Sequence, residues 1–269
     1  MAKLTSPSLT TDEIARYRKD GWVAPARPVF REDRFTALID YFDRALAALP
    51  PGERPENMDV PHFADPALFA WLFDDDVLDL VEPLLGPDLA LFSSHFICKP
   101  PGDGKRVPWH EDSAYWNGMM TPMEAVTVWV AIDRSDAGNG GMRVIPGTHT
   151  GGYSDYEPVD PTENVFRNEI RKELFDAKRA VTIELEPNRC SLHDARLMHG
   201  SDRNISNRRR CGFTMRYVST ATRYHHEKFP YHQLYLARGK DHAGNRYGDP
   251  SKPARELITA RIGQAHSGH

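Results

Sequence analysis

The spacing of hydrophobic residues changes once along this chain of 269 residues, near residue 88. Before that point apolar side chains recur every three or four residues, as on one face of a helix. After it they alternate in short segments rich in β-branched and aromatic residues. A helical part followed by many short strands is typical of a β-sandwich that helices support. The sequence therefore predicts a mainly β fold with a helical buttress, of the jelly-roll type.

The helices before residue 88 are placed by their end signals. Thr10 or Thr11 is a suitable N-cap for the first helix, Pro50-Pro51-Gly52 ends the second, and Gly86-Pro87 ends the last. Together with the apolar spacing, these signals predict helices that begin near residue 10 and that cover 31–49, 67–73 and 77–85.

The strands after residue 88 are bounded by turn-forming residues, such as the run at 138–141, Gly-Asn-Gly-Gly. They are expected at Leu89 to Lys99, Val126 to Ile132, Met142 to Ile145, Val181 to Leu185 and Arg210 to Val218.

The remaining segments complete a single predicted domain, 1–269. Residues 1–87 form its helical part, and 88–220 form a jelly-roll core that contains a polar insertion at 148–180. The insertion has some helical character around 165–174. Residues 221–269 are interpreted as a C-terminal lid or tail, with a helix expected at 254–262.

Composition excludes several classes of function. The net charge of -4 gives no electrostatic reason to expect nucleic acid as a partner. Three widely spaced cysteines without a CxxC pair argue against a disulfide framework and fit a reducing compartment. The first residues lack the apolar core of a signal peptide, and the longest aliphatic run, Val126 to Ile132, is too short to span a bilayer. We expect a cytoplasmic protein without a membrane partner, either a monomer or a homodimer.

A histidine and an aspartate two positions apart form the first candidate metal site. In an extended segment His110 and Asp112 project to the same side, so both can face one ion. A second histidine would complete the two-histidine, one-carboxylate arrangement that leaves positions open for other ligands. The same spacing recurs at His225 and Glu227, but only the first pair lies between two predicted strands. The second pair lies in the predicted lid.

The third ligand is predicted to be His199, which lies between two later strands. A jelly roll brings such distant strands together at one end of the barrel. The alternatives are His193, His95 and His149. The last of these follows a Pro-Gly turn and is expected to be a turn histidine bonded to the backbone.

An arginine on the last predicted strand is the candidate anion-binding residue. Strand parity puts a row of apolar residues beginning with Cys211 on one face, so Arg210 lies on the other face beside Gly212 and Thr214. These small neighbours leave room for the guanidinium to bind a carboxylate through two hydrogen bonds. The hydroxyl of Ser201 can add a further donor.

Pattern alone leaves the other positions open. Trp129 lies on the less apolar face of its strand, where it is either a second-core aromatic or a cavity wall, with core as the first interpretation. His95 and Lys99 share one face of the strand at 89–99. Each can be an ordinary edge or surface residue.

Six short motifs, taken in order, give a more specific indication. They are Lys99-Pro100-Pro101-Gly102, Trp109-His110-Glu111-Asp112-Ser113, Val128-Trp129-Val130-Ala131-Ile132, Gly138-Asn139-Gly140-Gly141-Met142, Pro146-Gly147-Thr148-His149 and His199-Gly200-Ser201 through Arg210. In their order and spacing they resemble the phytanoyl-CoA dioxygenase family of iron(II)- and 2-oxoglutarate-dependent oxygenases. The resemblance extends from about residue 20 to about residue 239.

This resemblance implies a cupin-like double-stranded β-helix in which His110, Asp112 and His199 bind iron(II). The reaction it implies uses O2 and 2-oxoglutarate, releases succinate and CO2, and hydroxylates an unactivated C–H bond of a small-molecule substrate. Related halogenases lack the carboxylate ligand, so the presence of Asp112 favours hydroxylation.

The resemblance also implies the cosubstrate site. Arg210, eleven residues after the distal histidine, would bind the far carboxylate of 2-oxoglutarate, with Ser201 and Trp129 in contact with it. His95 aligns with a position that lines the same pocket. Two other functions stay open: a cupin-like metalloenzyme that does not use 2-oxoglutarate, and a catalytically silent small-molecule-binding protein of the same fold.

Overall fold

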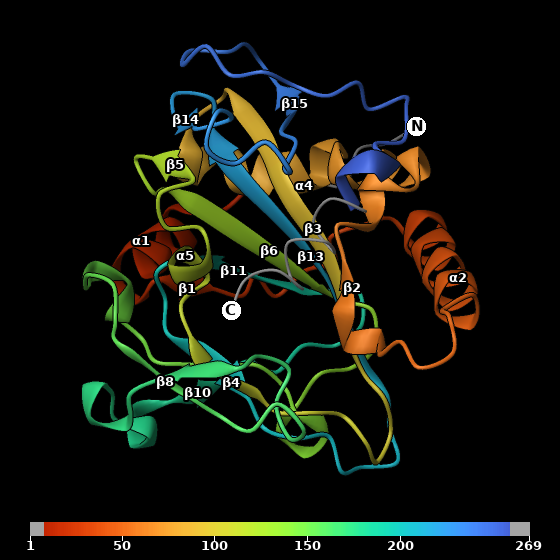
Figure 1. Ribbon diagram of the computed structural model, residues 1–269, viewed down its shortest axis with the longest axis vertical. Coiled ribbons are helices and arrows are strands. Elements are labelled where there is room, and N and C mark those ends of the chain that lie inside the picture. Colours follow the sequence, from red (N-terminus) through yellow and green to blue (C-terminus); the bar gives the residue numbers. More distant parts are fainter. Residues whose placement is uncertain (1–7, 259–269) are drawn as a thin grey trace.

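The structure is a computed structural model that describes residues 8–258, and its frame is a pair of antiparallel sheets. The larger sheet consists of β1 (Trp22–Val23), β2 (Met58–Asp59), β3 (Leu89–Lys99), β6 (Ala125–Ala131), β11 (Cys190–Asp194), β13 (Arg210–Ser219) and β15 (Tyr235–Arg238). The smaller sheet consists of β4 (Val107–His110), β7 (Arg143–Val144), β10 (Val181–Thr182) and β12 (His199–Ser201). In the view of Figure 1 the larger sheet crosses the upper half of the molecule and the smaller sheet lies below it.

Strands distant in the sequence are neighbours in both sheets. The order in the larger sheet is β1-β11-β6-β13-β3-β15, with β2 also paired to β3, and the order in the smaller sheet is β10-β7-β12-β4. Two short hairpin-like pairs complete the strands: β5 (Met120–Thr121) with β14 (Arg223–Tyr224), and β8 (Tyr156–Pro158) with β9 (Asn168–Ile170). The prediction of a mainly β fold of the jelly-roll type is confirmed.

The helices are α1 (Thr11–Asp20), α2 (Glu32–Ala47), α3 (Phe69–Leu72), α4 (Asp75–Leu85) and the short α5 (Asp112–Tyr115). The first begins as predicted, because the Thr10 hydroxyl accepts from the Glu13 backbone and the Glu13 carboxylate accepts from the Thr10 backbone. The expected helix at 67–73 is divided between a 3-10 turn and the single turn of α3.

The main core lies between the helices and one face of the larger sheet. Alternate residues of β13 (Cys211, Phe213, Met215 and Tyr217) are fully buried in it. The ring of Phe96 on β3 lies 4.2 Å from Phe213 and 5.1 Å from Phe42 of α2, measured between ring centres. Because the apolar half of β13 is used in this way, its other half faces the smaller sheet, as strand parity predicts.

Three differences from the sequence expectations have local causes. The part at 1–87 is not purely helical, because β1 and β2 join the edges of the larger sheet. The helical character expected at 165–174 is wrong: β9 lies there, followed by a 3-10 turn. The apolar Val165 and Phe166 that suggested a helix face line the site described below. Of the helix expected at 254–262, residues 255–258 are helical and the rest lies outside the described residues.

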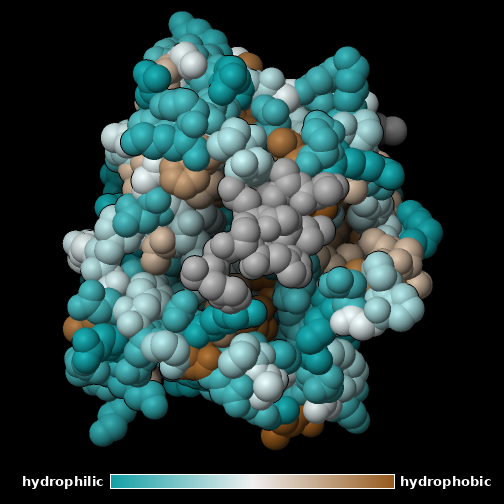
Figure 2. All heavy atoms as spheres, in the orientation of Figure 1, coloured by the Kyte–Doolittle hydropathy of each residue, from teal (hydrophilic) through white to brown (hydrophobic). Residues whose placement is uncertain are grey.

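The surface carries no sign of a membrane-spanning helix. Within residues 8–258, no helix is both long enough and apolar enough to cross a bilayer. On the face shown in Figure 2, hydrophilic residues predominate and hydrophobic residues form only scattered groups.

Candidate metal centre

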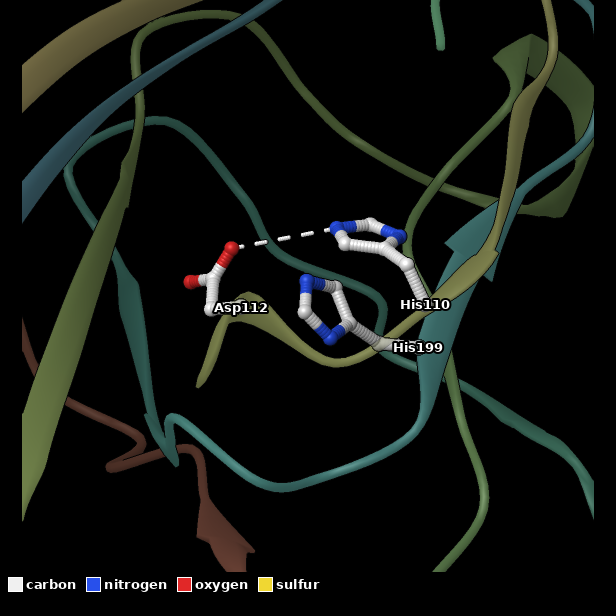
Figure 3. A group of neighbouring side chains, drawn as sticks. All are labelled: His110, Asp112 and His199. Carbon is white, nitrogen blue, oxygen red and sulfur yellow. Dashed lines mark ion pairs between the residues drawn. The ribbon is translucent and has the colours of Figure 1, made fainter. Parts of the chain in front are cut away.

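Two histidines face each other across neighbouring strands of the smaller sheet. β4 and β12 are antiparallel, with His110 directly opposite His199, and their ring centres are 4.0 Å apart. Asp112 follows β4 at the start of α5 and points toward both rings (Figure 3). One ligand atom from each of the three residues lies within 4.8 Å of the others. The fold thus brings together the three side chains that the sequence predicted as a group.

Both imidazoles are held with one nitrogen free. The Nδ1 atoms of His110 and His199 lie 2.8 Å from the carbonyl oxygens of Pro108 and Leu197. A carbonyl only accepts, so each Nδ1 carries the proton and each Nε2 offers a lone pair. Burial lowers the pKa of His110, and it lowers that of His199 well below the usual value, with the neighbouring His110 adding to the effect. Neutral imidazoles are the form that binds a metal ion.

Asp112 is held as a carboxylate. Burial alone would raise its pKa, but the positive charge of Arg216 holds the pKa well below its usual range. The Nε atom of Arg216 lies 3.4 Å from Oδ2, and the Thr127 hydroxyl donates to the same oxygen at 3.2 Å. The donor set of two neutral imidazoles and one ionised carboxylate, all buried, fits a divalent transition-metal ion.

The alternative histidines lie elsewhere or at the margin of this group. His193 is buried on β11 with its Nε2 atom 3.8 Å from Asp112, beside the metal-ligand candidates rather than among them. His149 lies in a 3-10 turn, and its Nε2 is 3.1 Å from the Arg18 carbonyl oxygen, as expected of a turn histidine. The Nε2 atom of His225, from the second motif, lies 3.0 Å from the Thr121 hydroxyl, just after the separate β5–β14 strand pair.

A narrow cavity, called the inner cavity below, opens beside the three residues between the two sheets. The larger sheet contributes His95, Thr127, Trp129, Arg210, Thr214 and Arg216 to its wall, and the smaller sheet contributes His110, His199, Gly200 and Ser201. The four residues predicted to contact the cosubstrate therefore line one space together with the metal-ligand candidates.

Arg210 is a buried cation that forms no ion pair with residues 8–258. Its guanidinium lies over the Trp129 ring, 4.8 Å from the ring centre, and its Nε has no hydrogen-bond partner among residues 8–258. No carboxylate of the described residues pairs with it. Burial lowers the pKa of Arg210 to about 10, so the group is still charged at neutral pH. Because an unpaired buried charge is costly, an anion bound in the inner cavity would stabilise Arg210.

Trp129 serves both roles that the sequence left open. It belongs to a small apolar cluster with Ala131 and Met142, and it also lines the inner cavity. A Cβ atom on Gly212 would lie 2.0 Å from the indole, so the glycine is what allows this ring to lie flat against β13.

His95 and Ser201 occupy opposite walls of the inner cavity. The Nε2 atom of His95 lies 2.8 Å from the Glu56 carbonyl oxygen. The hydroxyl of Ser201 accepts a hydrogen bond from Lys99 at 2.7 Å. The sequence left open whether Lys99 is an ordinary edge or surface residue; the structure excludes this, since Lys99 is 0% exposed. Thr127 and Glu56 were not predicted as site residues; parity with Trp129 could have indicated Thr127, whereas Glu56 lies in a short 3-10 helix without a sequence pattern.

A wider opening, called the outer cleft below, adjoins the inner cavity. Its volume is about 860 Å³, and both spaces share His95, Asp112, Val165, Phe166 and Arg216. The rest of its wall is formed by Asn57, Asp59, Phe92, Ser93, Tyr115, Trp116, Met119, Lys228, Phe229, Tyr231 and His232. The candidate metal centre thus adjoins the outer cleft, whose wall is rich in aromatic side chains.

The fold and the site together define a cupin-like β-sandwich protein with a buried two-histidine, one-aspartate metal centre. The sequence profile of the phytanoyl-CoA dioxygenase family matches residues 17–212, and the chain belongs to this family.

Relatives and solved structures agree with this assignment. The chain is 30% identical over 161 residues to a probable alpha-ketoglutarate-dependent hypophosphite dioxygenase of Stutzerimonas stutzeri, which covers 58% of the chain and 54% of that protein. It is 27% identical over 207 residues to the peroxisomal phytanoyl-CoA dioxygenase of Mus musculus, covering 73% of the chain and 58% of the relative. The chain thus spans a little over half the length of these curated relatives.

Solved structures show the same fold. The apo form of the non-heme monooxygenase ThoJ superposes with a TM-score of 0.73 at 23% identity, covering 95% of this chain and 96% of that one. EctD from S. alaskensis, solved with 2-oxoglutarate and 5-hydroxyectoine, superposes with a TM-score of 0.67 at 22% identity, covering 83% and 81%. The predicted double-stranded β-helix is thereby confirmed.

Proposed function

We propose that this protein is an iron(II)- and 2-oxoglutarate-dependent dioxygenase that hydroxylates an unactivated C–H bond of a small molecule, with succinate and CO2 as co-products. One observation carries the proposal: an unpaired buried guanidinium, Arg210, lies in the same cavity as a buried His-Asp-His group. A metal ion alone would explain the group but not the guanidinium. A dicarboxylate cosubstrate explains both.

The chain's own residues divide the work. The Nε2 atoms of His110 and His199 and the carboxylate of Asp112 would hold iron(II), which when bound supplies the activation of O2. Thr127 and Arg216 keep Asp112 ionised and oriented through its Oδ2 atom.

The cosubstrate would lie in the inner cavity. Arg210 would bind its far carboxylate through charge-assisted hydrogen bonds, and the Ser201 hydroxyl would donate a hydrogen bond to the same carboxylate. Trp129 would form the wall behind Arg210. His95 lies at the junction with the outer cleft, where its ring separates cosubstrate from substrate.

The outer cleft would bind the substrate. It opens directly onto Asp112, and its volume of about 860 Å³ suits a small organic molecule. The segment after residue 221 contributes Lys228, Phe229 and Tyr231 to its wall, in keeping with the predicted role of this segment as a lid. The aromatic walls would limit the access of water to the reacting groups. We also propose that the whole chain forms a single domain. The relatives described above as dioxygenases support the reaction class, and their differing substrates leave this chain's own to be found by assay.

The test needs no substrate. Full-length apo-protein is given iron(II) and then 2-oxoglutarate without oxygen, and the visible charge-transfer band of the ternary complex is recorded. We expect the band in the wild type, none in His199→Ala, and a need for at least about tenfold more 2-oxoglutarate in Arg210→Ala. Arg208→Ala is the matched control, because Arg208 is a nearby surface arginine paired with Asp136.

Two results would reject the proposal in different ways. Iron binding without any band would indicate a cupin-like metalloenzyme that does not use 2-oxoglutarate. No iron binding at all would indicate a catalytically silent binding protein of this fold.

A further inference from the structure

A lysine crosses from the larger sheet to the smaller one beside Ser201, a residue of the inner cavity wall. Lys99, the last residue of β3, is 0% exposed, and its ammonium donates to the Ser201 hydroxyl on β12 at 2.7 Å and to the backbone carbonyl of Asp202. A Cβ atom on Gly104 would lie 2.7 Å from the Lys99 Cβ. Position 104 therefore has to be a glycine for the Lys99 side chain to fit. The placement is tightly constrained.

Two buried cations lie next to each other there. Lys99 is directly opposite Arg210 in the β3–β13 register, and strand parity puts both side chains on the same face. Neither forms an ion pair with a carboxylate in the part of the chain that the structure describes. Burial, and then the neighbouring Arg210, lower the pKa of Lys99 well below its usual value. Like charges opposite each other destabilise a sheet, and a bound anion removes this repulsion.

The contact with Lys99 also decides where the Ser201 proton points. Lys99 is the donor in this hydrogen bond, so the Ser201 oxygen is the acceptor and its single O–H is directed elsewhere. Within residues 8–258 no acceptor for that O–H is found, and Ser201 lines the inner cavity. The hydroxyl therefore points as a donor into the space that Arg210 also faces.

We infer that Lys99 is a positioning residue that makes the inner cavity selective for a carboxylate-ended 2-oxo acid, by orienting the Ser201 hydroxyl as a donor and by adding a second positive charge when the anion is bound beside it. This inference rests on the proposed function and deepens it, because it says how the far end of the cosubstrate is distinguished from an uncharged one. Lys99 acts through Ser201 and does not itself touch the reacting groups.

The experiment compares two 2-oxo acids that differ only at the far end. Iron-loaded full-length protein is titrated without oxygen with 2-oxoglutarate or with 2-oxopentanoate, in which a methyl group replaces the far carboxylate. The charge-transfer band and calorimetry give Kd for each. In Lys99→Met the Kd of 2-oxoglutarate should rise at least about tenfold, equivalent to about 1.4 kcal/mol, while that of 2-oxopentanoate stays within about twofold.

A matched control and a double-variant cycle sharpen the comparison. Lys105→Met removes another lysine that donates to a backbone carbonyl, at Pro161, but on the exposed surface, and should leave both Kd values unchanged. In a Ser201→Ala background, Lys99→Met should have a smaller effect than in the wild type, because the hydroxyl that Lys99 orients is absent. If the effects of Lys99→Met and Ser201→Ala on the binding free energy of 2-oxoglutarate are fully additive, Lys99 does not act through Ser201.

The possible failures are distinguishable. If the wild type gives no band with either acid, the proposed function fails and the inference with it. If the wild type gives the band and Lys99→Met binds 2-oxoglutarate unchanged, or loses both acids equally, only the inference is overturned. Should Lys99→Met fail to bind iron, Lys99→Gln, which keeps an N–H donor but no charge, must still weaken 2-oxoglutarate selectively, and an unchanged ratio overturns the inference.

Discussion

Gly212→Ala provides a sharp test of how the cosubstrate wall is built. The added Cβ would lie 2.0, 2.2 and 2.5 Å from the Cζ2, Cε2 and Cη2 atoms of Trp129. Carbon atoms in ordinary contact are about 3.5–4.0 Å apart, so the indole or the strand must move by about 1.5 Å. Trp129 is only 2% exposed, so the narrow inner cavity that it lines is the main space into which it could move. Overpacking of this kind costs about 1–3 kcal/mol, and we expect the upper end of that range.

The variant should lose affinity as well as stability. The Trp129 ring supports the Arg210 guanidinium at 4.8 Å, so a displaced indole carries the arginine out of place. We therefore expect chemical unfolding to show the loss in the free energy of unfolding, and the anaerobic titration to show weaker 2-oxoglutarate binding. Gly152→Ala is the control, because nothing lies within 4 Å of a Cβ there and its change should stay within about 0.5 kcal/mol.

A second substitution identifies the cause. Trp129→Phe removes the six-membered ring of the indole to which all three contacting atoms belong. In that background Gly212→Ala should cost clearly less free energy of unfolding than in the wild type. An equal cost in both backgrounds would refute the reasoning, because the glycine would then be required by the backbone and not by the indole.

Three further predictions follow from burial and from ligand linkage. Iron(II) at 100 times its Kd should raise the free energy of unfolding by about 2.7 kcal/mol, and a gain that survives in His199→Ala would place the ion elsewhere. All three cysteines are buried, and burial raises the pKa of Cys190 to about 12, so iodoacetamide at pH 8 should label the protein only after unfolding; rapid labelling of folded protein, seen by mass spectrometry, would contradict this. Tyr217→Phe removes a 2.7 Å hydrogen bond to the buried Leu72 carbonyl and should cost about 1–3 kcal/mol in denaturant unfolding, whereas the exposed Tyr153→Phe should cost almost nothing.

Period-two alternation explains why so much of the site could be predicted. Side chains two apart in a strand share a face whatever the rest of the chain does, so parity alone put Arg210 opposite the apolar row of β13. The same local rule brought His110 and Asp112 to one side. The position of His199 between two later strands then selected it from several histidines, and the structure places it directly opposite His110.

What the sequence could not give depends on contacts between distant segments. A lysine at a strand end is normally exposed. Lys99 is buried because the fold packs it against Ser201, which lies 102 positions later in the chain. Likewise Val165 and Phe166 suggested one face of a helix, but these two apolar side chains line the inner cavity and the outer cleft. Burial imposed by a distant partner leaves no trace in local spacing.

The pairing of β4 with β12 has a consequence for the order in which the molecule is assembled. The two imidazoles meet only when a segment near residue 110 and another near residue 200 have both been synthesised and brought into register. Contacts of such long sequence separation form late and slowly. A nascent chain that lacks β12 can therefore present one imidazole and one carboxylate but no complete binding site. If iron(II) binds at this site as proposed, its loading would require the two sheets to be paired already, and it would stabilise only the molecules in which they are.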